Sequence, residues 1–406
     1  MTPKKYSSMA RAIASGIVLS GALVLAGCGG GGGETTTSSV GFTSMVTFGD
    51  SLSDIGTYKV GAIAAIGGGK WTVNSTTDKN WTELIAAQYK LPAPCPAQTG
   101  LFSILPGLPA VPVQNFSTCR NYAQGSSRVT SPAGPNSVAI QQAVLNAAGP
   151  TAAAQAAGIG LIALPVVNQM ANHLTNVGGA YNGKELVTVM AGGNDLFLNL
   201  NGVSNAAGGG AGAVGAAQFA GWSPAVQSAV AAGGAAASQA AAQAAVAGMA
   251  QAATELVTAI NAQVLGKGAK YVVVVNLPDV STTPFGNPLD ANTRGLMVNM
   301  ATAFNSTLSQ ALVGKAGILL VDAYTQGRDQ VANPAQYALS NVTVTACSKT
   351  SPNNPLAGSS LGCTASSLIP GDSSKYLFAD DVHLTPYGYN LLAQFVTKNL
   401  AAAGWL

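Results

Sequence analysis

A serine, a histidine and an aspartate stand where they could perform nucleophilic catalysis. Ser51 lies in a Gly-Asp-Ser-Leu run directly after a short apolar segment, which places it at a strand-to-helix turn. A serine hydroxyl is a poor nucleophile unless a neighbouring base removes its proton. Of the 2 histidines in the chain, His383 has an acidic residue, Asp380, three positions earlier, whereas His173 lies in an Ala/Asn-rich segment without acidic neighbours. A carboxylate can fix the imidazole tautomer, so we predict a catalytic triad of Ser51, Asp380 and His383 and a structural role for His173.

The predicted triad residues belong to four short polar blocks. In chain order the blocks are Gly49-Asp50-Ser51-Leu52, Asn121-Tyr122-Ala123-Gln124-Gly125, Gly192-Gly193-Asn194-Asp195 and Asp380-Asp381-Val382-His383. The first and third follow predicted strands, and the fourth precedes the last predicted helix. This set resembles the GDSL, or SGNH, hydrolase family, whose second name denotes a Ser, Gly, Asn and His on separate blocks. The resemblance covers about residues 42–403, and the run from Val273 to Pro278 is similar to the phospholipase/lecithinase/hemolysin branch.

The family resemblance also implies roles for other residues in the blocks. Ester hydrolysis passes through an anionic tetrahedral intermediate that preorganised hydrogen-bond donors stabilise. The family pattern implies an oxyanion hole made of the N–H groups of Ser51 and Gly125 and the side-chain amide of Asn194. Its Asp-x-x-His spacing favours Asp380 over Asp381 as the acid. Three residues depart from the usual family pattern and bear on substrate preference rather than on the triad: Thr57, Ser126 and Leu384.

The blocks require strands that end beside one another. Apolar and β-branched runs predict strands at Phe42–Phe48, Glu185–Ala191, Tyr271–Leu277 and Ile318–Asp322. Helical spacing predicts helices at 81–89, over most of 138–176, and at 245–264, 291–313 and 387–400. Strands that alternate with helices indicate an α/β fold with a parallel central sheet flanked by helices. The family resemblance implies the same, a flavodoxin-like three-layer sandwich.

Two segments lie outside this alternation. Residues 92–136 are rich in proline and predict a loop region that holds one cysteine pair. From about residue 200 to 250, alanine and glycine dominate and no charged residue occurs, which predicts an Ala/Gly-rich helical insertion. A transmembrane interpretation is disfavoured because glutamine and serine interrupt every window. We assign residues 42–406 to one SGNH hydrolase domain.

The N-terminal segment predicts export. A basic start precedes an apolar stretch that closes with Leu25-Ala26-Gly27-Cys28, which resembles the bacterial lipobox. We therefore expect residues 1–27 to be a lipoprotein signal peptide, Cys28 to be lipidated and residues 28–41 to form a Gly/Ser/Thr-rich tether. Gly29 indicates the outer membrane in the enterobacterial sorting pattern. The alternative is an ordinary signal peptide in which Cys28 has no role.

The remaining cysteines fit an oxidising compartment. They are four in number, Cys95, Cys119, Cys347 and Cys363, and three pairings are open. We favour Cys95–Cys119 and Cys347–Cys363, because both regions read as long loops. The first loop leads into the second block, so we expect that disulfide to affect turnover and the other chiefly to affect stability. No Cys-x-x-Cys or nearby histidine accompanies them, so no metal site is predicted.

The charge balance bears on the partners of the protein. The formal net charge is +3, but Lys4, Lys5 and Arg11 lie in the predicted signal peptide, and removing them from 18 basic residues leaves 15 against 15 acidic ones. Binding to nucleic acid needs clustered basic residues, and none occur, so nucleic acid is excluded as a partner. We expect a monomer that meets the membrane through the lipid on Cys28.

Together these observations predict a serine esterase or lipase that acts on acyl-ester or lipid substrates without a cofactor. Two other functions remain open at this point. An acyltransferase would use the same residues and pass the acyl group from Ser51 to an alcohol rather than to water. A non-catalytic lipoprotein could bind lipid or glycan on a decayed hydrolase fold, although the intact blocks argue against decay.

Overall fold

A computed structural model describes residues 39–102, 108–149 and 160–406. Its central sheet contains β1 (Ser44–Gly49), β4 (Glu185–Met190), β5 (Tyr271–Val275) and β6 (Ile318–Val321), in the order β1-β4-β5-β6. All three strand pairs are parallel, with Val187 beside Val46 and Val272. β1, β4 and β5 are almost entirely buried and together rich in valine, and β6 is partly buried, as expected of a parallel sheet that is covered on both faces. The four predicted strands are therefore confirmed.

The free edge of β1 is extended by the segment that carries the second block. Thr47 forms a parallel bridge with Asn121. The Thr47 N–H donates to the Arg120 carbonyl at 3.0 Å, and the Tyr122 N–H donates to the Thr47 carbonyl at 2.8 Å. These backbone bonds place the second block beside the carboxyl end of β1.

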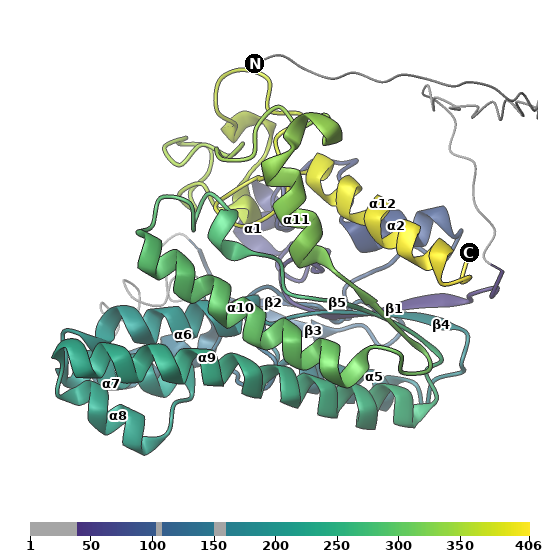
Figure 1. Cartoon of the computed structure of the whole chain (residues 1–406). Coiled ribbons are helices and arrows are strands. Elements are labelled where there is room, and N and C mark those ends of the chain that lie inside the picture. The colour runs from purple at the N-terminus through teal and green to yellow at the C-terminus, as the bar shows by residue number, and fades with distance from the viewer. Residues whose placement is uncertain (1–38, 103–107, 150–159) are drawn as a thin grey trace, which may run out of the picture. The chain divides into compact units, whose positions relative to one another are not determined.

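Alternate residues of the strands face two separate hydrophobic cores. Val272 and Val274 face a core completed by α5 (Val166–Asn176), α6 (Gly193–Ala206), α9 (Gly234–Ala259) and α10 (Ala291–Leu312). Val273 and Val275 face a core completed by α2 (Trp81–Gln88) and α12 (Pro386–Ala402). Figure 1 shows α2 and α12 on one side of the sheet and α9 and α10 on the other. This is the expected α/β arrangement, a parallel sheet between two helical layers.

The Ala/Gly-rich segment is helical, as predicted. It forms α7 (Gly210–Ala220), α8 (Pro224–Ala231) and the first turns of α9, and α7 packs against α6 (Figure 1). Trp222 anchors it, since the indole N–H donates to Asn199 at 2.7 Å and the ring lies over Gly202. Within the described parts of the chain, no helix has the length and apolar character needed to cross a membrane.

Several connections differ from the sequence predictions. The proline-rich region contains a hairpin, β2 (Gln98–Leu101) and β3 (Val111–Asn115), because the two short runs pair across the loop. The predicted helix at 138–176 is α3 (Val138–Ala148) and α5, and the described residues between them, 160–165, are not helical. A short α1 (Gly61–Ala65) and an α11 (Ala323–Ala332) that directly follows β6 were not predicted. The predicted signal peptide, Cys28 and most of the predicted tether lie outside the described residues.

Both sequence-local disulfides are present. Cys95 is bonded to Cys119 and Cys347 to Cys363. The first spans the β2–β3 hairpin. The second lies in the segment between α11 and α12, where the only regular structure described is short 3₁₀ turns.

Candidate active site

Ser51 lies two residues beyond β1, at the carboxyl end of the sheet, where ligands of open α/β sheets bind. Just before the turn that carries Ser51, the backbone of Gly49 lies close to that of Met190 on β4. A Cβ at position 49 would lie 2.2 Å from the Met190 carbonyl oxygen, so glycine is needed there. Asp50 steadies the turn by accepting the Leu52 N–H at 3.1 Å. Burial raises the pKa of Asp50 to about 7, so this carboxyl carries less negative charge near neutral pH than an exposed aspartate would.

His383 joins Ser51 to Asp380. Its Nε2 lies 2.8 Å from the Ser51 Oγ, and its Nδ1 lies 2.8 and 2.9 Å from the two Asp380 carboxylate oxygens. The acid and the base share one turn, because Asp380 Oδ1 accepts the backbone N–H of His383 at 2.8 Å and the Ala379 N–H donates to the His383 carbonyl. A histidine held in this way can accept the serine proton while the carboxylate stabilises the resulting imidazolium.

The two adjacent aspartates of the fourth block occupy different environments. Asp380 is buried, and burial opposes its charge, but the His383 ring and the donated hydrogen bonds hold its pKa well below its usual range. Asp381 is partly exposed and forms an ion pair with Lys349 at 2.7 Å. Only Asp380 contacts the imidazole, which agrees with the Asp-x-x-His spacing.

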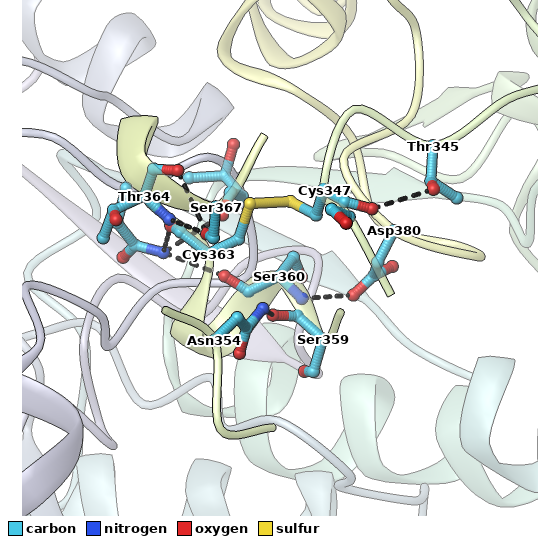
Figure 2. Close-up of a disulfide and its surroundings, with 12 residues drawn as sticks. Thr345, Cys347, Asn354, Ser359, Ser360, Cys363, Thr364, Ser367 and Asp380 are labelled. Carbon is cyan, nitrogen blue, oxygen red and sulfur yellow. Dashed lines mark hydrogen bonds between the residues drawn. A yellow bond between two sulfur atoms is a disulfide. The ribbon is translucent and has the colours of Figure 1, made fainter. Parts of the chain in front are cut away.

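A further hydrogen bond to the Asp380 carboxylate comes from the loop that carries Cys363. The Ser360 N–H donates to Asp380 Oδ2 at 2.8 Å. Figure 2 shows this bond beside the Cys347–Cys363 disulfide. Cys347 in turn donates its N–H to the carbonyl of Ala379, the residue before Asp380. The disulfide therefore links the loop that donates to Asp380 with the segment that carries it.

The expected oxyanion donors differ in whether their hydrogens are already used in other hydrogen bonds. Among the described residues, the Ser51 N–H forms no hydrogen bond. The Asn194 side-chain amide, in the first turn of α6, donates one hydrogen to the Ser127 carbonyl at 2.9 Å, and its second hydrogen is not used in that bond. The Gly125 N–H, by contrast, donates to Asp54 Oδ2 at 2.9 Å and is thus already engaged. The next N–H, that of Ser126, has no hydrogen-bond partner among the described residues, and Ser126 has a positive φ of 68°.

Trp71 contacts both His383 and the second block, a role that no motif in the sequence indicated. Its ring lies 4.7 Å from the His383 ring, centroid to centroid, with a tilt of 34°. A Cβ on Gly125 would lie 2.4 Å from the Trp71 indole, so glycine at 125 allows this close packing. The Tyr389 hydroxyl holds the Trp71 backbone through a bond of 3.1 Å to its carbonyl.

A largely apolar cavity opens beside Ser51 and His383. Its walls come from the start of α6, the connection between β5 and α10, one face of α11 and the residues before α12. Phe197, Leu277, Val280, Phe378 and Leu384 supply apolar surface. Across the described residues, no group of three or more histidine, cysteine, aspartate or glutamate side chains could hold a metal ion.

The other sequence-predicted residues lie elsewhere. His173 is buried against Phe48, Tyr122 and Tyr181, and burial lowers its pKa to about 4. Asp54, a further aspartate near the first block, holds its loop by accepting the N–H groups of Gly56 and Thr57 in addition to that of Gly125. Cys28 is outside the described part of the chain.

The parallel α/β sheet and the serine, histidine and aspartate at its edge define the class of protein. A family model for GDSL-like lipase/acylhydrolase matches residues 45–396, so the chain belongs to this family. Two curated relatives, each named Esterase EstA, come from Pseudomonas aeruginosa and Pseudomonas putida. Each is 32% identical over 139 residues, which cover 34% of this chain and 20% of the relative. The matched segment therefore spans a fifth of the length of each relative.

Proposed function

We propose that the chain is a serine esterase or lipase that hydrolyses carboxylic esters through an acyl-enzyme on Ser51. The observation that carries the proposal is the continuous set of short hydrogen bonds from Ser51 Oγ through His383 to Asp380. In this mechanism His383 takes the Ser51 proton as the oxygen attacks the ester carbonyl, and then protonates the leaving alcohol. Water, activated by His383, attacks the acyl-enzyme and releases the acid.

The tetrahedral intermediate needs donors that are not otherwise engaged. We assign the Ser51 N–H and the second amide hydrogen of Asn194 to the oxyanion. For the third donor we assign the Ser126 N–H in place of that of Gly125. The Asn194 amide is bonded to the carbonyl of Ser127, the residue after Ser126, so these groups belong to one local arrangement. Each donor of this kind contributes about 2.7–4 kcal/mol to lowering the barrier.

The apolar cavity supports a lipid-like acyl chain as the substrate of this site, and phospholipid and simple fatty esters are both candidates. An acyltransferase would use the same acyl-enzyme. Hydrolysis in the presence of added alcohol separates the two activities, because the ratio of transferred ester to free acid reports which acceptor the acyl-enzyme prefers.

The test of the nucleophile is Ser51→Ala. Loss of the attacking oxygen should lower ester hydrolysis by at least about 10³-fold, with the thermal transition retained because alanine fits the same turn. A fluorophosphonate should label Ser51 in the parent protein and leave the variant unlabelled. Retention of more than a few per cent of turnover, or labelling of another serine, would refute the assignment.

We also propose that the protein is exported and anchored in the bacterial outer membrane through lipid on Cys28. The support is the sequence Leu25-Ala26-Gly27-Cys28 after an apolar stretch. Growth with an alkyne-labelled fatty acid should label the parent protein and not Cys28→Ser. Equal labelling of both would refute the anchor.

A further inference from the structure

A polar side chain in the wall of the apolar cavity forms no hydrogen bond with another described residue. Gln330, on α11, is 7% exposed and lines the cavity that opens beside Ser51 and His383. In the described residues no hydrogen bond is formed by its side-chain amide. The amide borders the cavity and is not enclosed by protein, so a polar group of a ligand that fills the cavity could pair with it, whereas an apolar ligand would cover it unpaired.

The other polar groups around this cavity are already engaged. The Thr282 and Thr283 hydroxyls donate to the backbone carbonyls of Asp279 and Val280. Gln326, one turn before Gln330 on the same helix, interacts with the Tyr337 hydroxyl. Apart from the polar groups next to Ser51, the amide of Gln330 is thus the polar group of the described cavity wall that remains available to bind a ligand.

The cavity offers room along the face of α11 that carries Gln330. Ala323, Gly327 and Gln330 line it at helical spacing, so the face extends over about 10 Å from the first residue to the last. A Cβ on Gly327 would meet nothing within 4 Å. The charged residues of α11, Arg328 and Asp329, are paired instead with Asp279 and Asn333.

We propose that Gln330 recognises a hydroxyl or carbonyl group on the acyl chain, remote from the ester, so that the substrates are esters of hydroxy- or oxo-substituted fatty acids. The inference rests on the proposed esterase function. An amide suits this role because it can donate through its nitrogen and accept through its oxygen. The apolar walls select the aliphatic part of the chain, and an unsubstituted chain would leave the amide unpaired, which is how buried polar groups discriminate between substrates.

The experiment compares p-nitrophenyl decanoate with a set of p-nitrophenyl hydroxydecanoates whose hydroxyl moves along the chain. For the parent protein we expect one hydroxyl position at which kcat/KM is about tenfold above that of the plain ester, the value of one added hydrogen bond. Gln330→Leu should abolish that preference and raise kcat/KM for the plain ester. Gln326→Leu is the matched control and should keep the preference, because its side chain is already engaged.

The outcomes separate the inference from the function on which it rests. If the parent protein hydrolyses none of these esters, the proposed function fails. If it hydrolyses them without preference for any hydroxyl position, or if Gln330→Leu keeps the preference, the inference is overturned while the esterase function stands. A parent profile without a preferred hydroxyl position overturns the inference even if a variant does not fold.

A further pair of substrates checks which part of the ester occupies the cavity. Hexyl decanoate and 6-hydroxyhexyl decanoate carry the difference on the alcohol side. The proposal expects Gln330→Leu to leave their ratio unchanged. A ratio that changes only for this pair would place the alcohol in the cavity and overturn the assignment to the acyl chain.

Discussion

Replacing Cys347 and Cys363 together by alanine is expected to lower both stability and turnover. The disulfide closes a loop with a sequence separation of 16 residues, which is worth about 3 kcal/mol in the chain-entropy model. It also joins the Ser360 loop to the segment that precedes Asp380. Without it the Ser360 N–H loses its fixed position against the Asp380 carboxylate.

The size of the effect on turnover follows from that one bond. A hydrogen bond to a charged group contributes about 1.5–3 kcal/mol, and each 1.36 kcal/mol is tenfold in rate. If the bond steadies the carboxylate in the transition state, kcat/KM should fall about ten- to a hundredfold. The melting temperature should fall by roughly 5 °C.

The other disulfide provides the matched control. Cys95–Cys119 has a sequence separation of 24, so its removal should cost a similar free energy of unfolding, about 3 to 4 kcal/mol. The second block nevertheless stays bonded to Thr47 by its backbone. We therefore expect Cys95→Ala with Cys119→Ala to lower the melting temperature and to change kcat/KM by less than about threefold. This reverses the order expected from the sequence.

The assay measures kcat/KM and the rate of fluorophosphonate labelling for both double variants, well below their melting temperatures. Equal loss of activity in the two would show that lowered stability alone is responsible. Unchanged activity in the Cys347/Cys363 variant would show that Asn74, whose amide donates to the Ser360 and Cys363 carbonyls, suffices to hold the loop.

Three further variants test other contacts. Asp380→Asn should lower kcat about 10³–10⁴-fold, whereas Asp381→Asn removes only a surface ion pair and should change it less than about twofold; similar losses would contradict the geometry. Gly125→Ala should press a Cβ against the Trp71 indole and lower kcat with the fold retained, and normal turnover would show that the ring can yield. Between about pH 6.5 and 4 the unfolded chain binds a proton that the buried His173 excludes, so the free energy of unfolding should fall as the pH drops through this window, by about 3 kcal/mol at most. His173→Phe should flatten that slope, as measured by denaturant unfolding at each pH, and an unchanged slope would place its origin in other groups.

The sheet and the contact between Asp380 and His383 were predictable because their signals are local. Tyr271–Val275 is a tyrosine followed by four β-branched valines, a pattern typical of a buried strand, and Asp380 reaches His383 because both lie on one turn. The pairing of the cysteines was also local in sequence, and the structure contains both predicted bonds.

The contacts that sequence reasoning missed are those between distant segments. Nothing near Trp71 indicates that its ring packs on His383, and nothing near Gly125 indicates that Asp54 takes its N–H. The glycine at 125 is compatible with an oxyanion role and with packing against an indole, and its contact with Trp71 is visible only in the folded arrangement. Helix α11 has a weak apolar pattern because its buried face borders a cavity and carries Gln330 in place of an apolar residue.

The hydrogen bond between Ser51 and His383 joins residues 332 positions apart. Closing so long a loop costs chain entropy that is recovered only once the intervening layers have formed, whereas α6 to α9 contact their neighbours in sequence and can form early. Under the proposed mechanism, a partly folded chain therefore carries Ser51 as an ordinary alcohol, and the hydroxyl becomes nucleophilic only when the turn before α12 docks. The rate at which a fluorophosphonate labels the refolding protein would thus report when the turn before α12 docks. A chain truncated before His383 would not react with the reagent.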